Sequence, residues 1–370
     1  MPRVKLGDVA REYKATLKQT KGLPVVGLEH ITPGELQLEH WDQDVETTFS
    51  KGFKKGQVLF GRRRAYLKKA AVAPFDGVCS GDITVIEAIP GKILPNLLPF
   101  VIQNDLLFDF AIGQSAGSLS PRVKWEKLRN YEFNLPEYEQ QEAMVELLQA
   151  AYAAKRAYQK QMEATDELVK SQFIEEFKQI PKEDYRPLND VCTLITDGTH
   201  NPPRFVDSGI PFILVSNITG NVVTYDTPKY ITEETYEIMM KRTPIEKGDV
   251  LLSTVGSYGH PAVVVEDKKF AFQRHVAHLK PNKDIIDSRF LHTAILSSDV
   301  QEQIEVLVLG VAQKTLNLSA IKKIRIPVPS LDQQKHFIAF VEQSDKSKFE
   351  LQESIKRVDG LIKSLMQSEN

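Results

Sequence analysis

Residues 139–168 read EQQEAMVELLQAAYAAKRAYQKQMEATDEL, and the run continues to Phe177 without a Gly or a Pro. Residues 332–367 read DQQKHFIAFVEQSDKSKFELQESIKRVDGLIKSLMQ, with one late Gly and no Pro. In both runs the apolar residues recur at alternating spacings of four and three, a period that is typical of coiled coils. We therefore predict two long helices that pair along their apolar seams. The expected seam positions are Met144, Leu148, Ala151, Lys155, Tyr158, Met162, Thr165 and Val169 in the first helix, and Phe337, Val341, Ser344, Lys348, Leu351, Ile355, Val358, Ile362 and Leu365 in the second.

The two helices are part of a longer internal repeat. The second seam follows the first at an offset of 193, and the pair Gln333-Gln334 follows Gln140-Gln141 at the same offset. Upstream, residues 22–32 (GLPVVGLEHIT) match 209–219 (GIPFILVSNIT), and residues 53–60 (FKKGQVLF) match 245–252 (IEKGDVLL). Several matched blocks in the same order indicate two halves, each a globular domain followed by a long helix. The helices are predicted to act as a spacer between the two domains.

Within each half, the matched blocks predict short strands. Residues 25–31 and 212–218 are rich in β-branched residues, and residues 78–88 partly alternate. Residues 131–135 and 324–328 alternate and stop at a Pro, which ends a strand. Shorter helices are expected at 97–112 and 289–306. The predicted fold is α+β, with a mainly antiparallel or mixed sheet in each domain. The expected boundaries are 1–136 for the first domain, 137–180 for the central spacer helix, 181–329 for the second domain and 330–370 for the C-terminal spacer helix.

Composition limits the class of protein. A chain of 370 residues with 42% hydrophobic and 26% charged residues has the profile of a soluble protein with two or more domains. No apolar run approaches the roughly 20 residues that span a bilayer, and the N-terminus has no apolar signal core, so we expect a cytoplasmic protein. Cys79 and Cys192 are too few for a disulfide framework, and we expect packed thiols. The net charge of −2 gives no overall bias towards nucleic acid, so any DNA-binding surface must be local.

One motif suggests an enzyme. Residues Asn201-Pro202-Pro203 are similar to the motif with which amino-methyltransferases hold a target amino group, but Arg204 stands where those enzymes have an aromatic residue. A glycine-rich strand-to-helix turn for a methyl donor is not found in the sequence. A proline-rich loop is the favoured interpretation. The 8 His residues are scattered, which argues against a metal site.

A dense cluster of basic residues lies in the first half. Lys54, Lys55, Arg62, Arg63, Arg64, Lys68 and Lys69 lie close together in sequence, with Tyr66 among them. Such a cluster suits DNA phosphates, and Arg side chains can read guanine edges; a solvated loop is the alternative. The matching stretch of the second half, residues 253–260 (STVGSYGH), is polar, although Tyr258 matches Tyr66. A shared scaffold with different side chains is what two readers of different sequences would require.

At this point the chain resembles the specificity subunit of type I restriction-modification systems, over nearly its whole length. The resemblance rests on residues 197–203 (DGTHNPP), 248–252 (GDVLL) with Gly256, 58–67 (VLFGRRRAYL) with 76–80 (DGVCS), and 326–334 (IPVPSLDQQ). Residues 133–139 (FNLPEYE) are a weaker version of that last junction. The resemblance implies two target recognition domains separated by an antiparallel coiled coil, in a pseudo-two-fold arrangement. It also implies that each domain reads half of a split DNA site.

The same resemblance implies partners and the absence of catalysis. Such a subunit is not an enzyme by itself; it binds double-stranded DNA and positions two adenine-N6 methyltransferase subunits and, in the full complex, restriction endonuclease subunits. No cofactor is expected in this chain, and S-adenosylmethionine is expected on the methyltransferase. Two alternatives stay open: a self-contained adenine methyltransferase that uses Asn201-Pro202-Pro203, and a coiled-coil scaffold that does not bind DNA. The residues predicted to contact DNA lie in polar or basic turns: Arg62, Arg63, Arg64, Tyr66, Thr199, His200, Ser257, Tyr258, His260 and Lys314.

Overall fold

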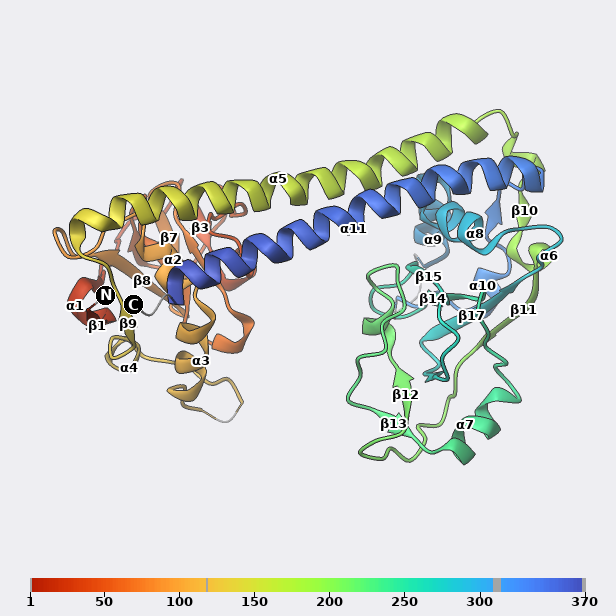
Figure 1. Cartoon of the computed structure of the whole chain (residues 1–370), viewed down its shortest axis with the longest axis horizontal. Coiled ribbons are helices and arrows are strands. Elements are labelled where there is room, and N and C mark those ends of the chain that lie inside the picture. Colours follow the sequence, from red (N-terminus) through yellow and green to blue (C-terminus); the bar gives the residue numbers. More distant parts are fainter. Residues whose placement is uncertain (1, 118, 309–313, 368–370) are drawn as a thin grey trace. The chain divides into compact units, whose positions relative to one another are not determined.

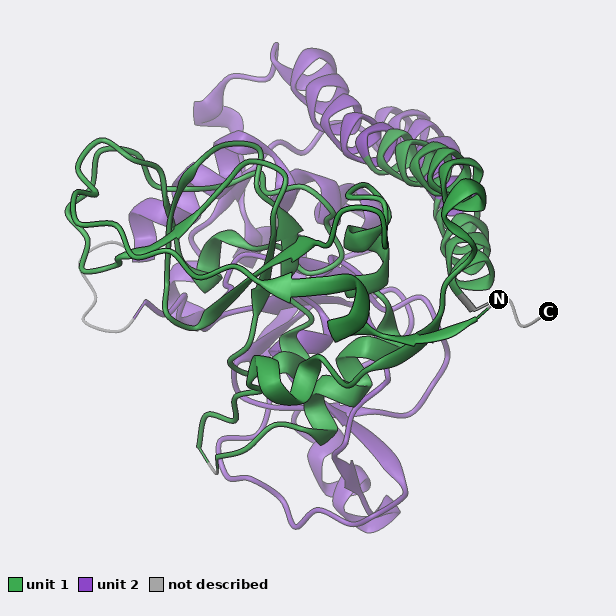
Figure 2. Cartoon of the chain, turned by 90° about the vertical axis from the view of Figure 1, so that its left-hand side faces the viewer, with its two compact units in different colours: residues 1–159, 352–370 green, residues 160–351 purple. Residues whose placement is uncertain are grey.

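The strands of the four-stranded sheet pair in the same order in the two halves. In the computed structural model, which describes residues 2–117, 119–308 and 314–367, the chain forms two compact units (Figure 1; Figure 2). Unit 1 comprises residues 1–159 and 352–370, and unit 2 comprises residues 160–351. Each unit therefore contains one globular domain and a segment of both long helices.

Unit 1 contains a four-stranded antiparallel sheet in the order β2 (Ala10–Glu12), β8 (Ile83–Ala88), β5 (Val58–Gly61), β6 (Ala70–Val72). A mixed sheet has the order β3 (Val25–Val26), β7 (Gly77–Cys79), β4 (Lys51–Phe53), in which β3 is parallel to β7. Strand β1 (Arg3–Lys5) pairs with β9 (Glu132–Asn134). The helices are α1 (Leu6–Val9), α2 (Leu98–Ile102), α3 (Asp105–Gly113) and α4 (Trp125–Leu128).

Unit 2 repeats the four-stranded sheet and the two-stranded ladder, whereas its mixed sheet has a different strand at the centre. Its antiparallel sheet has the order β11 (Cys192–Asp197), β17 (Val276–Pro281), β14 (Val250–Ser253), β15 (Pro261–Val263). Its mixed sheet has the order β13 (Tyr230–Ile231), β12 (Ile210–Ile213), β16 (Ala271–Phe272), and β10 (Arg186–Pro187) pairs with β18 (Arg325–Ile326). The helices are α6 (Leu188–Val191), α7 (Glu233–Met240), α8 (Ser288–Leu296), α9 (Ser298–Val308) and α10 (Leu318–Ile321). The predicted repeat of two α+β domains is confirmed.

The central strands explain why these sheets are stable. All four residues of β5 (VLFG) and of β14 (VLLS) are buried, because each strand lies between two neighbours and has both faces covered. Val58 and Phe60 belong to one apolar core of unit 1, and Leu59 belongs to another. In unit 2, Val250 and Leu252 belong to one core and Leu251 belongs to another. Successive side chains of each strand therefore point into two different cores. Burial of each side chain of this size stabilises the folded state by about 1.5–3 kcal/mol.

Some predicted elements are shorter than expected. The strand predicted at 25–31 ends at Val26 and continues as the 3-10 turn η1 (Leu28–His30), and the run at 78–88 divides into β7 and β8, which belong to different sheets. The division falls at a turn in which the Ser80 hydroxyl accepts a hydrogen bond from the Asp82 N–H at 3.2 Å. The helix predicted at 97–112 is two helices, because Asn104 caps the start of α3 by accepting from the Leu106 N–H. The segment at 289–306 also divides into two, α8 and α9, on either side of Ser297.

Two long helices, α5 (Tyr138–Phe177) and α11 (Leu331–Gln367), lie side by side and antiparallel (Figure 1). Within unit 1, Lys155 of α5 pairs with Asp359 of α11 at 2.7 Å; within unit 2, Asp166 of α5 pairs with Lys348 of α11 at 2.9 Å. Residue numbers therefore fall along α11 as they rise along α5. Every predicted seam position is buried or partly buried, so the seam prediction is confirmed. No helix in the described part of the chain has the length and apolar character to cross a membrane.

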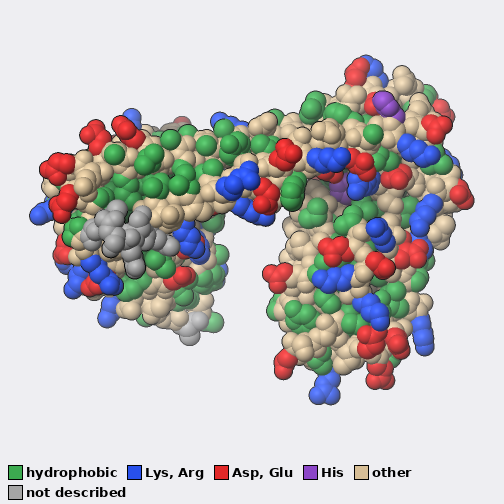
Figure 3. Space-filling model, viewed as in Figure 1, with side chains coloured by type: hydrophobic (Ala, Val, Ile, Leu, Met, Phe, Trp, Pro, Cys, Tyr) green, Lys and Arg blue, Asp and Glu red, His purple; other side chains and the backbone are tan. Residues whose placement is uncertain are grey.

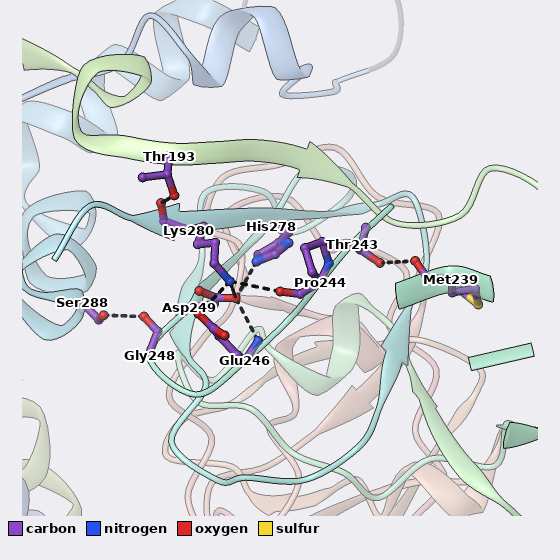
Figure 4. Close-up of polar contacts among 10 residues, drawn as sticks. All are labelled: Thr193, Met239, Thr243, Pro244, Glu246, Gly248, Asp249, His278, Lys280 and Ser288. Atoms are coloured by element: carbon purple, nitrogen blue, oxygen red, sulfur yellow. Dashed lines mark hydrogen bonds and ion pairs between the residues drawn. The ribbon is translucent and has the colours of Figure 1, made fainter. Parts of the chain in front are cut away.

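One buried polar cluster distinguishes the two units (Figure 4). In unit 2, the Asp249 carboxylate lies 2.7 Å from Nε2 of His278 and 3.5 Å from Nζ of Lys280, and it accepts from the Glu246 N–H at 2.9 Å. The matching positions of unit 1 carry Gln57, whose amide accepts from the Lys54 N–H at 2.7 Å and donates to Glu87 at 2.6 Å. The turn before the central strand is thus held in the same way in both units, by a neutral amide in unit 1 and by a carboxylate in unit 2.

Candidate nucleic-acid interface

Three segments meet at the same place in both units and form one backbone arrangement, which we call the reading frame. In unit 1, the Arg62 N–H donates to the Asp82 carbonyl at 3.0 Å, and the Val123 N–H donates to the Arg62 carbonyl at 3.0 Å. In unit 2, the Thr254 N–H donates to the His275 carbonyl at 3.0 Å, and the Leu316 N–H donates to the Thr254 carbonyl at 2.9 Å. The bridge between Arg63 and Arg122 likewise recurs between Val255 and Thr315. Each unit therefore presents side chains from the same three backbone positions.

At the reading frame of unit 1, two guanidinium groups pair with one carboxylate. Asp82 lies 2.7 Å from Nε of Arg122 and 3.3 Å from Nη1 of Arg63, and Nη2 of Arg63 donates to the Ser120 hydroxyl at 3.1 Å. The hydrogen bond from Arg122, with the further pairing to Arg63, lowers the pKa of Asp82, so this carboxyl is ionised at neutral pH. The Arg122 and Arg63 side chains stay 41% and 38% exposed, so the carboxylate fixes them while they still face solvent.

The turn after Arg63 is the most exposed part of this site. Arg64 has a φ of 53° and Lys68 a φ of 50°, and these two left-handed residues bracket the 3-10 turn η2 (Ala65–Leu67). Tyr66 lies on this turn with 53% of its surface exposed. Lys68 pairs with Asp105 at 2.6 Å, and Lys69 donates to the Leu28 carbonyl at 2.6 Å.

The basic cluster of the sequence is divided by a strand. Lys54 and Lys55 precede β5, whereas Arg62 and the following basic residues come after it, so they lie at opposite ends of that strand. Lys54 pairs with Asp76 at 2.7 Å, and this hydrogen bond raises the pKa of the lysine. The basic surface at the reading frame is therefore formed by Arg62, Arg63, Arg64 and Arg122, without the lysines before β5.

In unit 2 the reading frame borders a cavity of about 260 Å³. His200 and Asp197 reach it from the end of β11, with Nε2 of His200 at 2.9 Å from the Asp197 carboxylate. Arg242 pairs with the other oxygen of Asp197 at 2.7 Å. Burial lowers the pKa of His275, and the neighbouring Arg274 lowers it further, so His275 is neutral at pH 7. The other lining residues are Thr254, Val255, Thr315, Leu316, Asn317 and Leu318.

The structure places the predicted residues of unit 2 in two locations. His200 lines the cavity, Thr199 lies beside it and donates to the Asn201 carbonyl at 2.8 Å, and the exposed Lys314 directly precedes Thr315 of the reading frame. Ser257 is exposed in the turn after β14. Tyr258 is turned away: its hydroxyl donates to the Glu305 carboxylate at 3.0 Å, which raises the pKa of the tyrosine. His260 contacts Asn221 at 3.3 Å and borders a different cavity.

Several residues of the reading frame were missed by sequence reasoning. They are Asp82, Ser120 and Arg122 in unit 1, and Asp197, Arg274, His275 and Thr315 in unit 2. The offset of 193 between the two halves could have found two of them, because Thr315 follows Arg122 by 193 residues. Asp82 carries no such signal, since an isolated Asp in a Ser-Gly-Asp turn predicts only the turn.

Charge is mixed over the rest of the surface. Figure 3 shows acidic and basic side chains interspersed on the face of unit 2 that it presents, without an extended basic area. Among the described residues, no group of three or more His, Cys, Asp or Glu side chains is placed to hold a metal ion. Asn201 and Arg204 are exposed in a loop without regular structure. Local side-chain chemistry at the reading frame is thus the distinctive feature of each unit.

Comparison with known proteins agrees with the duplicated fold. The family model described as "Type I restriction modification DNA specificity domain" matches residues 3–164 and 182–358, once in each half. The specificity subunit of the type I restriction enzyme EcoBI from Escherichia coli is 28% identical over 227 residues, which is 59% of this chain and 48% of that protein. The MjaVIII specificity subunit from Methanocaldococcus jannaschii is 20% identical over 340 residues, 84% of this chain and 76% of that protein.

A solved structure shows the same fold. A chain from a study titled as the structural basis of complex assembly and conformational transition of the type I R-M system has a TM-score of 0.54 at 19% identity, and the match covers 99% of this chain and 96% of that one. The chain spans about half the length of the EcoBI subunit that it matches. Because the family model covers both halves, with one domain in each, the chain belongs to the family of type I restriction-modification DNA specificity subunits.

Proposed function

We propose that this chain selects the DNA sequence on which a type I restriction-modification complex acts, and that each unit reads one half of a two-part site. The observation that carries the proposal is the reading frame, which has one backbone geometry in both units and different side chains in each. Sequence is read by side chains at base edges, whereas phosphate contacts only position the protein. Two copies of one frame with different side chains suit two different half-sites.

The chemistry of the two frames predicts different contacts. Arginine donates in a fork to O6 and N7 of guanine, so Arg63 and Arg122 of unit 1 suit a G·C pair in the major groove. Arg62, Arg64 and Tyr66 lie beside them and suit the backbone or a neighbouring base. In unit 2, Thr199, His200, Ser257 and Lys314, together with Arg274 and His275, form the proposed contact surface. We leave Tyr258 and His260 out of the proposed surface, because Tyr258 donates to Glu305 and His260 contacts Asn221.

The chain is the non-catalytic component, as in the specificity subunits to which it is related, and the enzymatic activities sit in partner subunits. The proposed partners are methyltransferase and restriction subunits, with two methyltransferase copies that carry S-adenosylmethionine. Methylation of a base requires its removal from the stack, and that step belongs to the methyltransferase. The complex is expected to act on host DNA in the cytoplasm. Asn201-Pro202-Pro203 is followed by Arg204 in an exposed loop, and no observation favours a self-contained methyltransferase.

Mapping adenine methylation in the host genome with and without this gene tests the proposal. A two-part motif should disappear when the gene is deleted. Exchange of residues 1–136 for the corresponding domain of a related subunit should then change one half of the motif and leave the other half unchanged. A contiguous motif, or a map that does not depend on the gene, would contradict the proposal.

A further inference from the structure

One carboxylate beside the reading frame of unit 2 holds two basic side chains. Asp197, at the end of β11, pairs through one oxygen with Nη2 of Arg242 at 2.7 Å, and its other oxygen lies 2.9 Å from Nε2 of His200. The Asp197 side chain is 13% exposed, whereas those of Arg242 and His200 are 55% and 53% exposed. The carboxylate is therefore shielded from solvent while both of its partners face it.

This arrangement repeats the chemistry of unit 1, where Asp82 holds Arg63 and Arg122. The two carboxylates come from different places in the fold. Asp82 lies in the turn before β8, and the residue that follows it by 193 positions is His275, not Asp197. The shared backbone of the two units therefore does not by itself account for a carboxylate that holds two basic groups at both frames.

The frame positions of unit 2 lack the arginines of unit 1. Val255 and Thr315 stand at the bridge where unit 1 has Arg63 and Arg122, and they border the cavity of about 260 Å³. Neither side chain can donate a fork of hydrogen bonds. Arg274 also lines this cavity, but its Nε donates to the neutral ring of the neighbouring histidine at 3.2 Å instead of to a carboxylate. A carboxylate-held arginine at this frame is thus supplied by Asp197.

The backbone fixes the turn at residues 197–200 against the frame. An added Cβ at Gly198 would clash with the Phe272 carbonyl oxygen, so only glycine permits this close approach. The Thr199 carbonyl accepts from the Arg274 N–H at 3.1 Å, and the residue after Arg274 belongs to the reading frame. The carboxylate therefore has a defined position relative to the frame.

The backbone on either side of Arg242 is fixed as well. The N–H groups of Arg242 and Thr243 donate to the Met239 carbonyl at 3.0 and 3.1 Å, and the Thr243 hydroxyl donates to the same carbonyl at 3.1 Å (Figure 4). The Pro244 carbonyl accepts from Nζ of Lys280 of β17 at 3.1 Å. Arg242 therefore starts from a defined point between the end of α7 and the main sheet, and Asp197 defines where its guanidinium group ends.

A guanidinium group that a carboxylate orients can present its remaining N–H groups in a fixed direction, as a fork that matches O6 and N7 of guanine. From these observations we propose that Arg242 reads a guanine in the half-site of unit 2, and that Asp197 is the positioning residue that orients it. The inference rests on the proposed function, because it takes unit 2 as the reader of one half-site. It adds which side chain reads that half-site and which base pair it selects.

The test measures the affinity of the assembled complex for its cognate duplex and for duplexes with single substitutions across the site. In Arg242→Gln, the preference for G·C at one base pair of the unit 2 half-site should fall by about 5- to 150-fold, and the unit 1 half-site should be unchanged. Asp197→Asn should reduce the preference at the same base pair by a smaller factor, because Arg242 stays but loses the charge that orients it.

Lys241→Gln is the matched control. Lys241 is exposed and carries the same charge at the adjacent position, but Arg242 is the residue that pairs with Asp197. The control should leave the preference at every base pair unchanged. An ion pair that only ties α7 to β11 would act on stability and would weaken all duplexes alike, so base-pair preference separates a reading role from a structural one.

The outcomes also separate this inference from the proposed function. Equal weakening of all duplexes by Arg242→Gln, or an unchanged preference at every base pair, would overturn the inference; so would a change in the unit 1 half-site. A two-part methylation motif in the wild type, unaltered by the Arg242 variant, would leave the proposed function intact. The lack of a two-part motif in the wild type would overturn both.

Discussion

Gln141 in unit 1 and Gln334 in unit 2 make the same three hydrogen bonds to backbone groups. The Gln141 amide accepts from the Leu94 N–H at 2.8 Å and donates to the Lys92 and Pro136 carbonyls at 3.3 and 3.2 Å. The Gln334 amide accepts from the Asp287 N–H and donates to the Ile285 and Pro329 carbonyls, each at 2.9 Å. Every partner in unit 2 is the unit 1 partner plus 193. This side chain fixes the first turn of each long helix to the loop before the domain's helices.

Replacing this glutamine should destabilise its unit. Gln334 is fully buried, so Gln334→Leu leaves the Asp287 N–H and two carbonyls without partners in the interior. An unsatisfied buried group costs about 1–3 kcal/mol, and we expect a loss of about 2–5 kcal/mol in the free energy of unfolding of unit 2. Urea denaturation checks the value. The adjacent Gln333→Leu is the control, because Gln333 is exposed and bonds only with Ser330.

Replacement of Asp249 should lower the free energy of unfolding more than replacement of Gln57, its counterpart in unit 1. Asp249→Ala leaves the buried His278 without its carboxylate and removes one partner of Lys280. Breaking a buried ionic cluster in this way costs about 3–5 kcal/mol, whereas Gln57→Ala in unit 1 removes a hydrogen-bonded amide and costs about 1–3 kcal/mol. Thermal unfolding of both variants measures the difference. Equal losses would show that the charges in unit 2 add nothing to the arrangement of unit 1.

Stability of unit 2 should fall as the pH drops. Burial lowers the pKa of His292, whose Nε2 lies 3.1 Å from the Asn221 carbonyl, with Asp345 and Lys348 as charged neighbours. A histidine whose pKa is lowered in the folded state contributes fully to stability above its unfolded-state pKa of about 6.5. Below that pH the unfolded state binds the proton more readily than the folded state, so the contribution is lost. His292→Gln, which keeps an N–H donor, should therefore flatten the slope of stability against pH below about pH 6.5.

The sequence predicts those parts of the fold that follow from a repeated pattern. It does not predict contacts between residues that meet only in the folded chain. The helices, their seam and the duplicated sheets follow from periodicity and from the offset of 193, because both are properties of the chain itself. The carboxylate of Asp82 between Arg63 and Arg122 could not be predicted, since the three residues meet only when β5, β8 and the segment before α4 are assembled. Tyr258 shows the limit of matching by sequence: it aligns with Tyr66, yet its hydroxyl donates to Glu305 of α9, a contact that the match does not predict.

The reading frame of unit 1 provides the sharpest test of base recognition. Arg122→Ala should remove discrimination at one base pair of one half-site, at a cost of about 1–3 kcal/mol against the cognate duplex, and leave the other half-site unchanged. Asp82→Asn should produce a smaller loss at the same base pair, because the two guanidinium groups stay but lose the charge that orients them. Arg3→Ala is the control, since Arg3 pairs with Glu132 at 3.0 Å away from the frame.

Binding of the assembled complex to duplexes with single substitutions across the site measures these effects. If Arg122 contacts phosphate, its replacement will instead weaken all duplexes equally and reduce the dependence of affinity on salt by about one ion. Weakening of both half-sites by Arg122→Ala would contradict the assignment of one half-site to each unit. A change confined to one base pair identifies that pair as the one that unit 1 reads with arginine.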